Sequence, residues 1–123
     1  MTQTKTITHW INGALDTGKT ERTSEVFNPA TGQVSANVAL ANVATVDKAV
    51  NVATEAFNSW RHSSLTKRTQ VLFAFRELVL QNKEKIAALI TAEHGKVLSD
   101  ASGEVTRGLE VVEFACGIPH LLK

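Results

Sequence analysis

Hydrophobic and polar positions follow two different periods along this chain, and the change falls after Ala41. Before Ala41, apolar residues alternate with polar ones, which is the period of a β-strand with one buried face. After Ala41, apolar residues recur every three or four positions, which is the period of an amphipathic α-helix. We therefore expect an α+β fold that is mainly helical, with a β-hairpin region over residues 1–41 and a helical region over residues 42–123.

The first region carries two turn signals between its alternating segments. The alternation at 7–11 is followed by Asn12-Gly13, a pair that readily adopts the positive φ angles of a tight hairpin. The segment 28–32 contains a proline near its start and a glycine at its end, and it precedes a second alternating segment at 34–38. The pattern predicts two β-hairpins, or one hairpin and an edge strand.

The second region predicts four helices, each with a recognisable start or end. The first carries an apolar stripe that runs from Val46 to Trp60. The expected bounds are Thr45 as N-cap to about Trp60, the residue after Ser64 to about Gln81, Asn82 as N-cap to Gly95 as the left-handed C′ residue, and about Leu98 to Cys116, with Pro119 opposing any continuation.

The fourth expected helix has apolar residues on two sides. One side is a stripe that we expect to pack on the neighbouring helices, and the other is a smaller group near the opposite side. A helix with two apolar sides is either deeply buried or covered by a part of the protein that lies outside this chain. The two groups are Ala101, Val105, Leu109, Val112 and Cys116, and then Val111, Phe114 and Ile118.

Arg107 lies in the middle of the second apolar group, where a positive charge needs an anionic partner. One interpretation is an ordinary surface ion pair with Glu104 or Glu110, which lie three residues away on either side. Another is that Arg107 faces a cavity and binds a carboxylate through two parallel hydrogen bonds. A third is a role in packing or between subunits. The residues by themselves leave all three open.

The other reactive side chains form no set of nucleophile, base and orienting residue. Cys116 lies on the main apolar stripe without a nearby base, which favours a buried structural thiol over a nucleophile. The four histidines are scattered without ligand spacing, so we expect no metal site. No glycine-rich phosphate loop surrounds Gly95-Lys96. We therefore predict no catalytic, cofactor-binding or metal-binding residue in this chain.

Composition narrows the classes of function. The 123 residues include 13 basic and 12 acidic side chains, and a net charge of +1 offers no electrostatic footprint for nucleic acid. Even the longest uncharged apolar runs, such as Val71 to Phe75, are far too short to span a membrane. The N-terminus lacks a secretory or transit signal, and a single cysteine permits no internal disulfide. We expect a cytoplasmic protein that binds neither nucleic acid nor membrane.

Several stretches, in their order and spacing, resemble the N-terminal part of the aldehyde dehydrogenase superfamily. The sequence of the fourth expected helix is similar to the corresponding segment of one subgroup, the CoA-acylating methylmalonate-semialdehyde dehydrogenases. The stretches that carry the wider resemblance are Trp10-Ile11-Asn12-Gly13, Asn28-Pro29-Ala30-Thr31-Gly32, the helix end from Ala53 to Trp60, and Glu93-His94-Gly95-Lys96. Those that carry the narrower one are Gly103-Glu104-Val105-Thr106-Arg107-Gly108 and Val112-Glu113-Phe114-Ala115-Cys116-Gly117.

This resemblance implies oxidation of malonate or methylmalonate semialdehyde with NAD, decarboxylation, and transfer of the acyl group to CoA. It implies that residues 1–123 are an incomplete portion of the cofactor-binding domain of an α/β enzyme. It also implies that the fourth helix lines the substrate tunnel and that Arg107 binds the substrate carboxylate in the complete enzyme. The family's catalytic cysteine, activating glutamate, oxyanion asparagine, NAD-binding segment and oligomerising strand have no counterpart here. The chain alone is therefore expected to be inactive and to bind no cofactor.

The expected partner is the remainder of a homo-oligomeric dehydrogenase, or a second copy bound through exposed apolar surface. The alternative is a stand-alone helical interaction module that dimerises through the second apolar side of the fourth helix. Charged residues in place of Val111, Phe114 and Ile118 would have adapted the chain to a solitary existence. All three are apolar, which favours the fragment of an enzyme.

Overall fold

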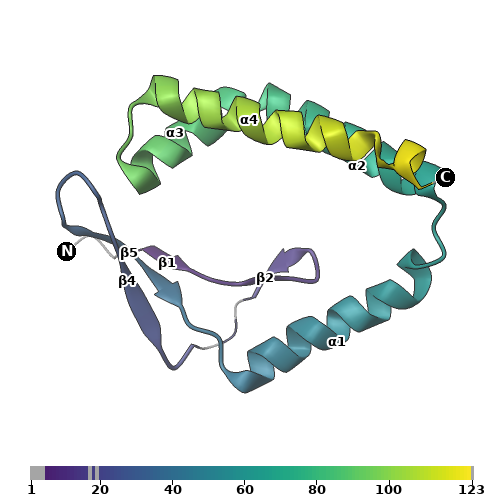
Figure 1. The fold of residues 1–123 in the computed structure, drawn as a ribbon. Coiled ribbons are helices and arrows are strands. Elements are labelled where there is room, and N and C mark those ends of the chain that lie inside the picture. Colours follow the sequence, from purple (N-terminus) through teal and green to yellow (C-terminus); the bar gives the residue numbers. More distant parts are fainter. Residues whose placement is uncertain (1–4, 17, 19, 123) are drawn as a thin grey trace. The chain divides into compact units, whose positions relative to one another are not determined.

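The computed structural model describes residues 5–16, 18 and 20–122, so the N-terminal residues 1–4, where we expect no targeting signal, lie outside it. The chain divides into two compact units, residues 1–62 and residues 63–123 (Figure 1). Short strands followed by four helices are confirmed. The elements are β1 (Lys5–Ile7), β2 (Trp10–Ile11), β3 (Ala14–Leu15), β4 (Thr23–Phe27), β5 (Val34–Ala39), α1 (Val43–Trp60), α2 (Leu65–Gln81), α3 (Lys83–His94), α4 (Leu98–Cys116) and the 3₁₀ turn η1 (Ile118–Leu121).

A three-stranded sheet forms the centre of the first unit, with β5 between β1 and β4 (Figure 1). β4 pairs with β5 in antiparallel fashion, as a hairpin requires. β1 pairs with β5 in parallel, with Lys5 opposite Ala36 and Ile7 opposite Val38. The expected single strand over 7–11 is therefore wrong, because β1 joins this sheet while β2 pairs with β3 in a separate hairpin. Alternation in the sequence carries no information about which strand is the neighbour.

Both expected turns are confirmed. Asn12 and Gly13 join β2 to β3 with φ angles of 56° and 74°, as a two-residue hairpin of this type demands. In the second turn, the side-chain oxygen of Asn28 accepts a hydrogen bond from the backbone N–H of Ala30 at 2.8 Å. Gly32 then leaves the turn with a φ of 69°. The turn chemistry thus determined both hairpins locally.

One of the expected helix caps is wrong, and a second is right in position but lacks the capping hydrogen bond. Helix α1 begins at Val43, and Asn42, not Thr45, is its N-cap. The Asn42 side-chain oxygen accepts hydrogen bonds from both the backbone N–H and the hydroxyl of Thr45, each at 2.9 Å, because asparagine caps helices as well as threonine does. Asn82 is the N-cap residue of α3 as expected, but its side chain makes no cap hydrogen bond there, and its amide nitrogen donates to the carbonyl of Leu78 at the end of α2.

The remaining helix boundaries are confirmed. Ser64 caps α2 by accepting a hydrogen bond from the backbone N–H of Lys67 at 3.2 Å. Gly95 ends α3 in the left-handed conformation, with a φ of 83°. α4 ends at Cys116, and η1, which contains Pro119, follows it.

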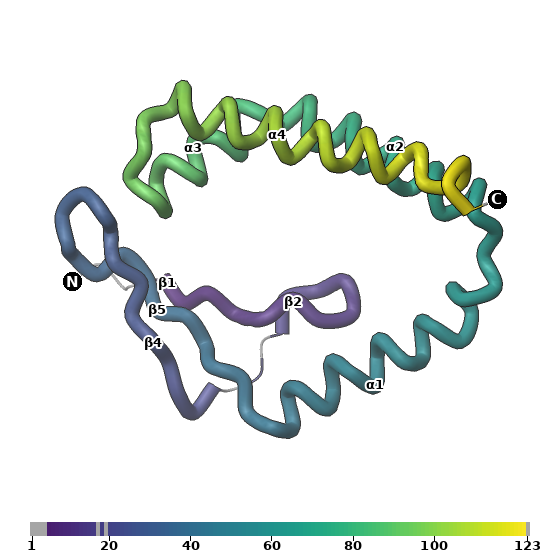
Figure 2. The backbone as a smooth tube through the Cα atoms, viewed as in Figure 1, coloured from purple at the N-terminus to yellow at the C-terminus, as the bar shows by residue number. Residues whose placement is uncertain are grey.

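The second unit has its core between α3 and α4, and α4 also packs along α2 (Figure 2). Ala87 of α3 and Ala101 of α4 are 1% and 0% exposed, and Val105 lies beside them. Small side chains at this position let the two helix backbones approach closely. Partly buried Val79, Ile86 and Ile90 surround the cluster.

Candidate functional site

Helix α4 presents one face to the core of its unit. Ala101, Val105, Leu109 and Cys116 of the expected stripe are buried, and Val112 is half-buried. The apolar residues recur at helical spacing, so burying this stripe against α2 and α3 fixes which side of α4 remains outside. The packing expected for the stripe is confirmed, and Cys116 is a buried thiol.

The opposite face of α4 is exposed in this chain and carries Arg107 among apolar side chains. Val111 and Phe114 are 68% and 67% exposed, and Ile118 just beyond the helix is also exposed. The side chain of Arg107 is 82% exposed. A large cation surrounded by uncovered apolar groups is an arrangement suited to a ligand with one charged end and one apolar end. We call Arg107, Val111, Phe114 and Ile118 the outer face of α4.

Arg107 forms an ion pair with Glu110, which is one of the partners considered from the sequence. Its Nη1 donates to Oε2 of Glu110 at 3.1 Å. The other partner considered, Glu104, instead forms an ion pair with Lys96. Within the described part of the chain, Arg107 makes no further hydrogen bond, so one N–H of the guanidinium is used and the rest of its fork is open. The ion pair and carboxylate binding are therefore compatible.

A second arginine, Arg76 of α2, was not singled out from the sequence. Its Nε and Nη2 donate to Oε1 of Glu113 on α4 at 3.0 and 2.8 Å, and its Nη1 donates to Glu77 at 2.5 Å. These hydrogen bonds, the one to Glu113 first, raise the pKa of Arg76 above its ordinary value. The pair spans 37 positions of sequence, and helical periodicity gives no sign of which side chains meet over such a separation.

An apolar groove crosses the three helices of the second unit and has a volume of about 400 Å³. It runs beside the cluster of Ala87, Ala101 and Val105 and touches the side of α4 that bears Glu104. Among the residues that the structure describes, Glu104 is the one polar side chain that lines the groove, so the groove offers apolar surface for packing and few groups for chemistry. Its lining residues are Phe75, Val79, Ile86, Ile90, Glu104, Val105, Gly108 and Val112.

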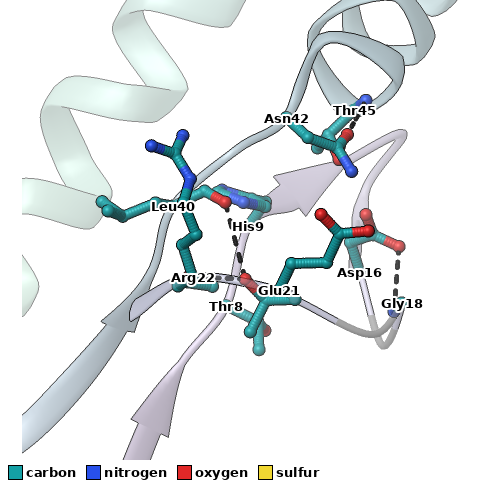
Figure 3. A pocket seen from close by; sticks show the side chains of 11 residues that line it. Thr8, His9, Asp16, Gly18, Glu21, Arg22, Leu40, Asn42 and Thr45 are labelled. Carbon is teal, nitrogen blue, oxygen red and sulfur yellow. Dashed lines mark hydrogen bonds between the residues drawn. The ribbon is translucent and has the colours of Figure 1, made fainter. Parts of the chain in front are cut away.

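The first unit contains a small polar pocket where the β1–β2 connection, the segment before β4 and the start of α1 meet (Figure 3). Its volume is about 40 Å³, which is room for little more than a water molecule. Asp16 accepts hydrogen bonds from Lys48 at 3.1 Å and from the backbone N–H of Gly18, and these lower the pKa of Asp16. His9, Glu21 and Arg22 also line the pocket. We assign it a structural role, because Asp16 is already held by its neighbours.

The described residues contain no cluster of three or more His, Cys, Asp or Glu side chains that could hold a metal ion. None of the helices, over the part of the chain that the structure describes, is long and apolar enough to cross a membrane.

Comparison with known proteins agrees with this geometry. The model of the aldehyde dehydrogenase family matches residues 16–123. Malonate-semialdehyde dehydrogenase of Pseudomonas aeruginosa is 47% identical over 120 residues, which are 96% of this chain and 24% of that protein. Malonate-semialdehyde dehydrogenase 2 of Oceanobacillus iheyensis is 44% identical, over 99% of this chain and 26% of that protein. The chain thus spans about a quarter of the length of these relatives.

Solved structures of aldehyde dehydrogenases also match this chain. A Sinorhizobium meliloti protein assigned as a methylmalonate-semialdehyde dehydrogenase, crystallised with NAD, matches with a TM-score of 0.92 and 40% identity, over 100% of this chain and 25% of its own. Aldehyde dehydrogenase 21 of Physcomitrella patens, in complex with its reaction product succinate, matches with a TM-score of 0.84 and 26% identity, over 98% of this chain and 25% of its own.

The chain belongs to the aldehyde dehydrogenase family. Its similarity to malonate- and methylmalonate-semialdehyde dehydrogenases extends over the whole of it, as the resemblance of the fourth helix implied.

Proposed function

We propose that this chain is the first quarter of an NAD-dependent, CoA-acylating malonate- or methylmalonate-semialdehyde dehydrogenase, in which Arg107 binds the carboxylate of the substrate. The observation that carries the proposal is the outer face of α4. Arg107 lies there 82% exposed with most of its guanidinium open, and apolar side chains follow it along the helix. The names of the relatives support the substrate class, because malonate and methylmalonate semialdehydes each carry a carboxylate and an aldehyde.

Arg107 would act by orienting the substrate. A guanidinium and a carboxylate form two parallel hydrogen bonds in one plane, which fixes the direction of the rest of a short substrate. The apolar neighbours Val111 and Phe114 would exclude water from the carbon chain between the two ends. The aldehyde would then be held at a set distance from the reactive groups that the complete enzyme supplies.

The chemistry itself belongs to other parts of the enzyme. The described residues lack the strand, glycine-rich turn and helix that hold a dinucleotide, so no step that involves NAD or CoA is assigned to this chain. Cys116 is buried on the core face of α4, which is a poor position for a nucleophile. We infer that residues 1–123 are an incomplete portion of the cofactor-binding domain and are inactive alone.

The remainder of the dehydrogenase is the proposed partner. Large apolar side chains are exposed on α1, α2 and α4, including Phe57, Phe75 and Phe114 at 50% or more. Apolar surface of this extent marks faces that other polypeptide covers.

Substitution of Arg107 in the complete dehydrogenase tests the substrate assignment. Arg107→Leu should lower kcat/KM for malonate semialdehyde about 10- to 100-fold, because a hydrogen-bonded charge loses its partner. The same variant should leave kcat/KM for propionaldehyde, which lacks the carboxylate, within about twofold. Arg107→Lys keeps the charge without the fork and should fall between the two. Equal losses for both aldehydes would end the assignment.

The intact mass of the polypeptide made in its source cells tests the relation to a longer protein. A species near four times the length supports the proposal. A stable product of 13.3 kDa would instead show that this chain is a protein in its own right. It would then be related to the dehydrogenases by descent and not by function.

A further inference from the structure

We propose that Glu110 is a positioning residue that competes with the substrate carboxylate for Arg107, and thereby limits how strongly the outer face of α4 favours carboxylated aldehydes. The inference rests on the proposed role of Arg107. It concerns a different residue, and it predicts a change in the opposite direction from the loss of Arg107.

The geometry assigns Glu110 this role among the acidic residues of α4. Its Oε2 accepts a hydrogen bond from Nη1 of Arg107 at 3.1 Å, one turn along the helix. The other two glutamates of α4 are engaged elsewhere, Glu104 with Lys96 and Glu113 with Arg76. Glu110 is therefore the carboxylate that already occupies the guanidinium to which a substrate would bind.

The ion pair between Arg107 and Glu110 is weak enough for another carboxylate to take the place of Glu110. The two side chains are 82% and 56% exposed, and an exposed ion pair is weak because water and salt screen it. A substrate carboxylate can share the fork with Glu110 or replace it on Nη1. In either case it meets a second negative charge, which weakens its binding. An uncharged aldehyde experiences neither the attraction of Arg107 nor the opposition of Glu110.

Removing the negative charge of Glu110 tests the inference in the complete dehydrogenase. Glu110→Gln should lower the KM for malonate semialdehyde about two- to fivefold, the range expected for one exposed charge pair. KM for propionaldehyde and kcat for both aldehydes should not change. The gain should shrink as salt is added, because screening already weakens the opposing charge.

Three variants separate the competing charge from a structural effect. Glu110→Asp keeps the charge and should retain the original KM ratio between the two aldehydes. Glu55→Gln on α1 makes the same change in net charge, and Glu55 has no ion pair among the described residues, so this variant should keep the original KM ratio between the two aldehydes. In an Arg107→Leu background, where no guanidinium holds the substrate carboxylate beside Glu110, Glu110→Gln should change the ratio much less than it does with Arg107 present.

The outcomes distinguish this inference from the proposed function. If Arg107→Leu penalises both aldehydes equally, the assignment of Arg107 fails, and the role of Glu110 fails with it. If Arg107→Leu penalises malonate semialdehyde alone while Glu110→Gln leaves its KM unchanged or raises it, Arg107 keeps its role and the inference about Glu110 is wrong.

Discussion

Two nitrogens of Arg76 on α2 donate hydrogen bonds to a single carboxylate oxygen of Glu113 on α4, at 3.0 and 2.8 Å. The two helices also pack along each other, and the buried apolar stripe fixes which side of α4 faces outward. A two-point hydrogen bond restricts the rotation of α4 further, because both N–H groups must remain directed at the acceptor. The pair thus helps to hold α4 in the rotation that leaves Arg107 outside.

Loss of this interhelical pair should destabilise the second unit more than loss of the pair on the outer face. We expect Arg76→Leu to lower the urea midpoint of unfolding measurably, since it removes two hydrogen bonds between helices. Arg107→Leu should leave the midpoint nearly unchanged, because its pair joins residues within one helix. Circular dichroism at 222 nm during a urea titration measures both. Equal midpoints for the two variants would contradict a role of Arg76 in joining the helices.

Two glycines on either side of the α3–α4 connection should respond to alanine in opposite directions. Gly95 has a φ of 83°, which a side chain adopts only with strain, so Gly95→Ala should cost about 1 kcal/mol. Gly103 lies within α4, and a Cβ added there meets no atom within 4 Å. Gly103→Ala should therefore stabilise the chain by about 0.5–1 kcal/mol. Thermal unfolding of the two variants checks the opposite signs, and a loss for both would refute the account of Gly103.

Acid should remove a contribution that Glu104 makes to the stability of the second unit. The hydrogen bond from Lys96 lowers the pKa of Glu104 below its ordinary value of 4.5, although burial opposes it. A carboxyl group with a lowered pKa stabilises the folded state above its unfolded pKa, and the contribution disappears as the pH falls through the folded value. The stability difference between the original chain and Glu104→Gln should thus be constant above about pH 5 and shrink below pH 4.5.

Urea titrations at several pH values measure this difference, in which the contribution of Asp16 cancels. Lys96→Met serves as the matched variant, because it removes the same hydrogen bond from the other side. A difference that persists undiminished to pH 3 would show that the pair with Lys96 does not control the titration of Glu104.

The isolated chain should bind a hydrophobic dye strongly or elute as a species larger than a monomer. Phe114 and Ile118 are exposed, as the two-sided pattern of the fourth helix predicted, and nothing polar covers them in the described residues. Phe114→Lys should reduce the dye signal or the apparent size, whereas Thr106→Lys adds the same charge on the exposed polar part of α4 and should not. A compact monomer that does not bind the dye would count against a missing partner surface.

Sequence reasoning was accurate where the determining interaction is local. The hairpin at Asn12-Gly13, the turn that ends at Gly32 and the end of α3 at Gly95 each depend on backbone conformations of one or two residues. It was less accurate where two residues could serve equally well. Asn42 took the N-cap position expected for Thr45, since both residue types can accept a capping hydrogen bond and Asn42, three residues earlier, accepts the one from the backbone N–H of Thr45.

The candidate site was found in part. The periodicity of the fourth helix placed Arg107 among apolar residues opposite the core stripe, and the structure shows that this face is uncovered in the chain. The choice of Glu110 over Glu104 as its partner depended on Lys96, which reaches Glu104 from the loop before α4. Arg76 was missed altogether, because its partner lies on another helix.

The sequence by itself determined the order of the elements, both turns, most helix ends and the two-sided character of α4, because each depends on residues close together along the chain. The tertiary structure alone decided that β1 pairs in parallel with β5, that Arg76 meets Glu113, and that Lys96 occupies Glu104. These are contacts between distant segments, and their choice follows from how apolar faces pack together, which no local pattern of residues records.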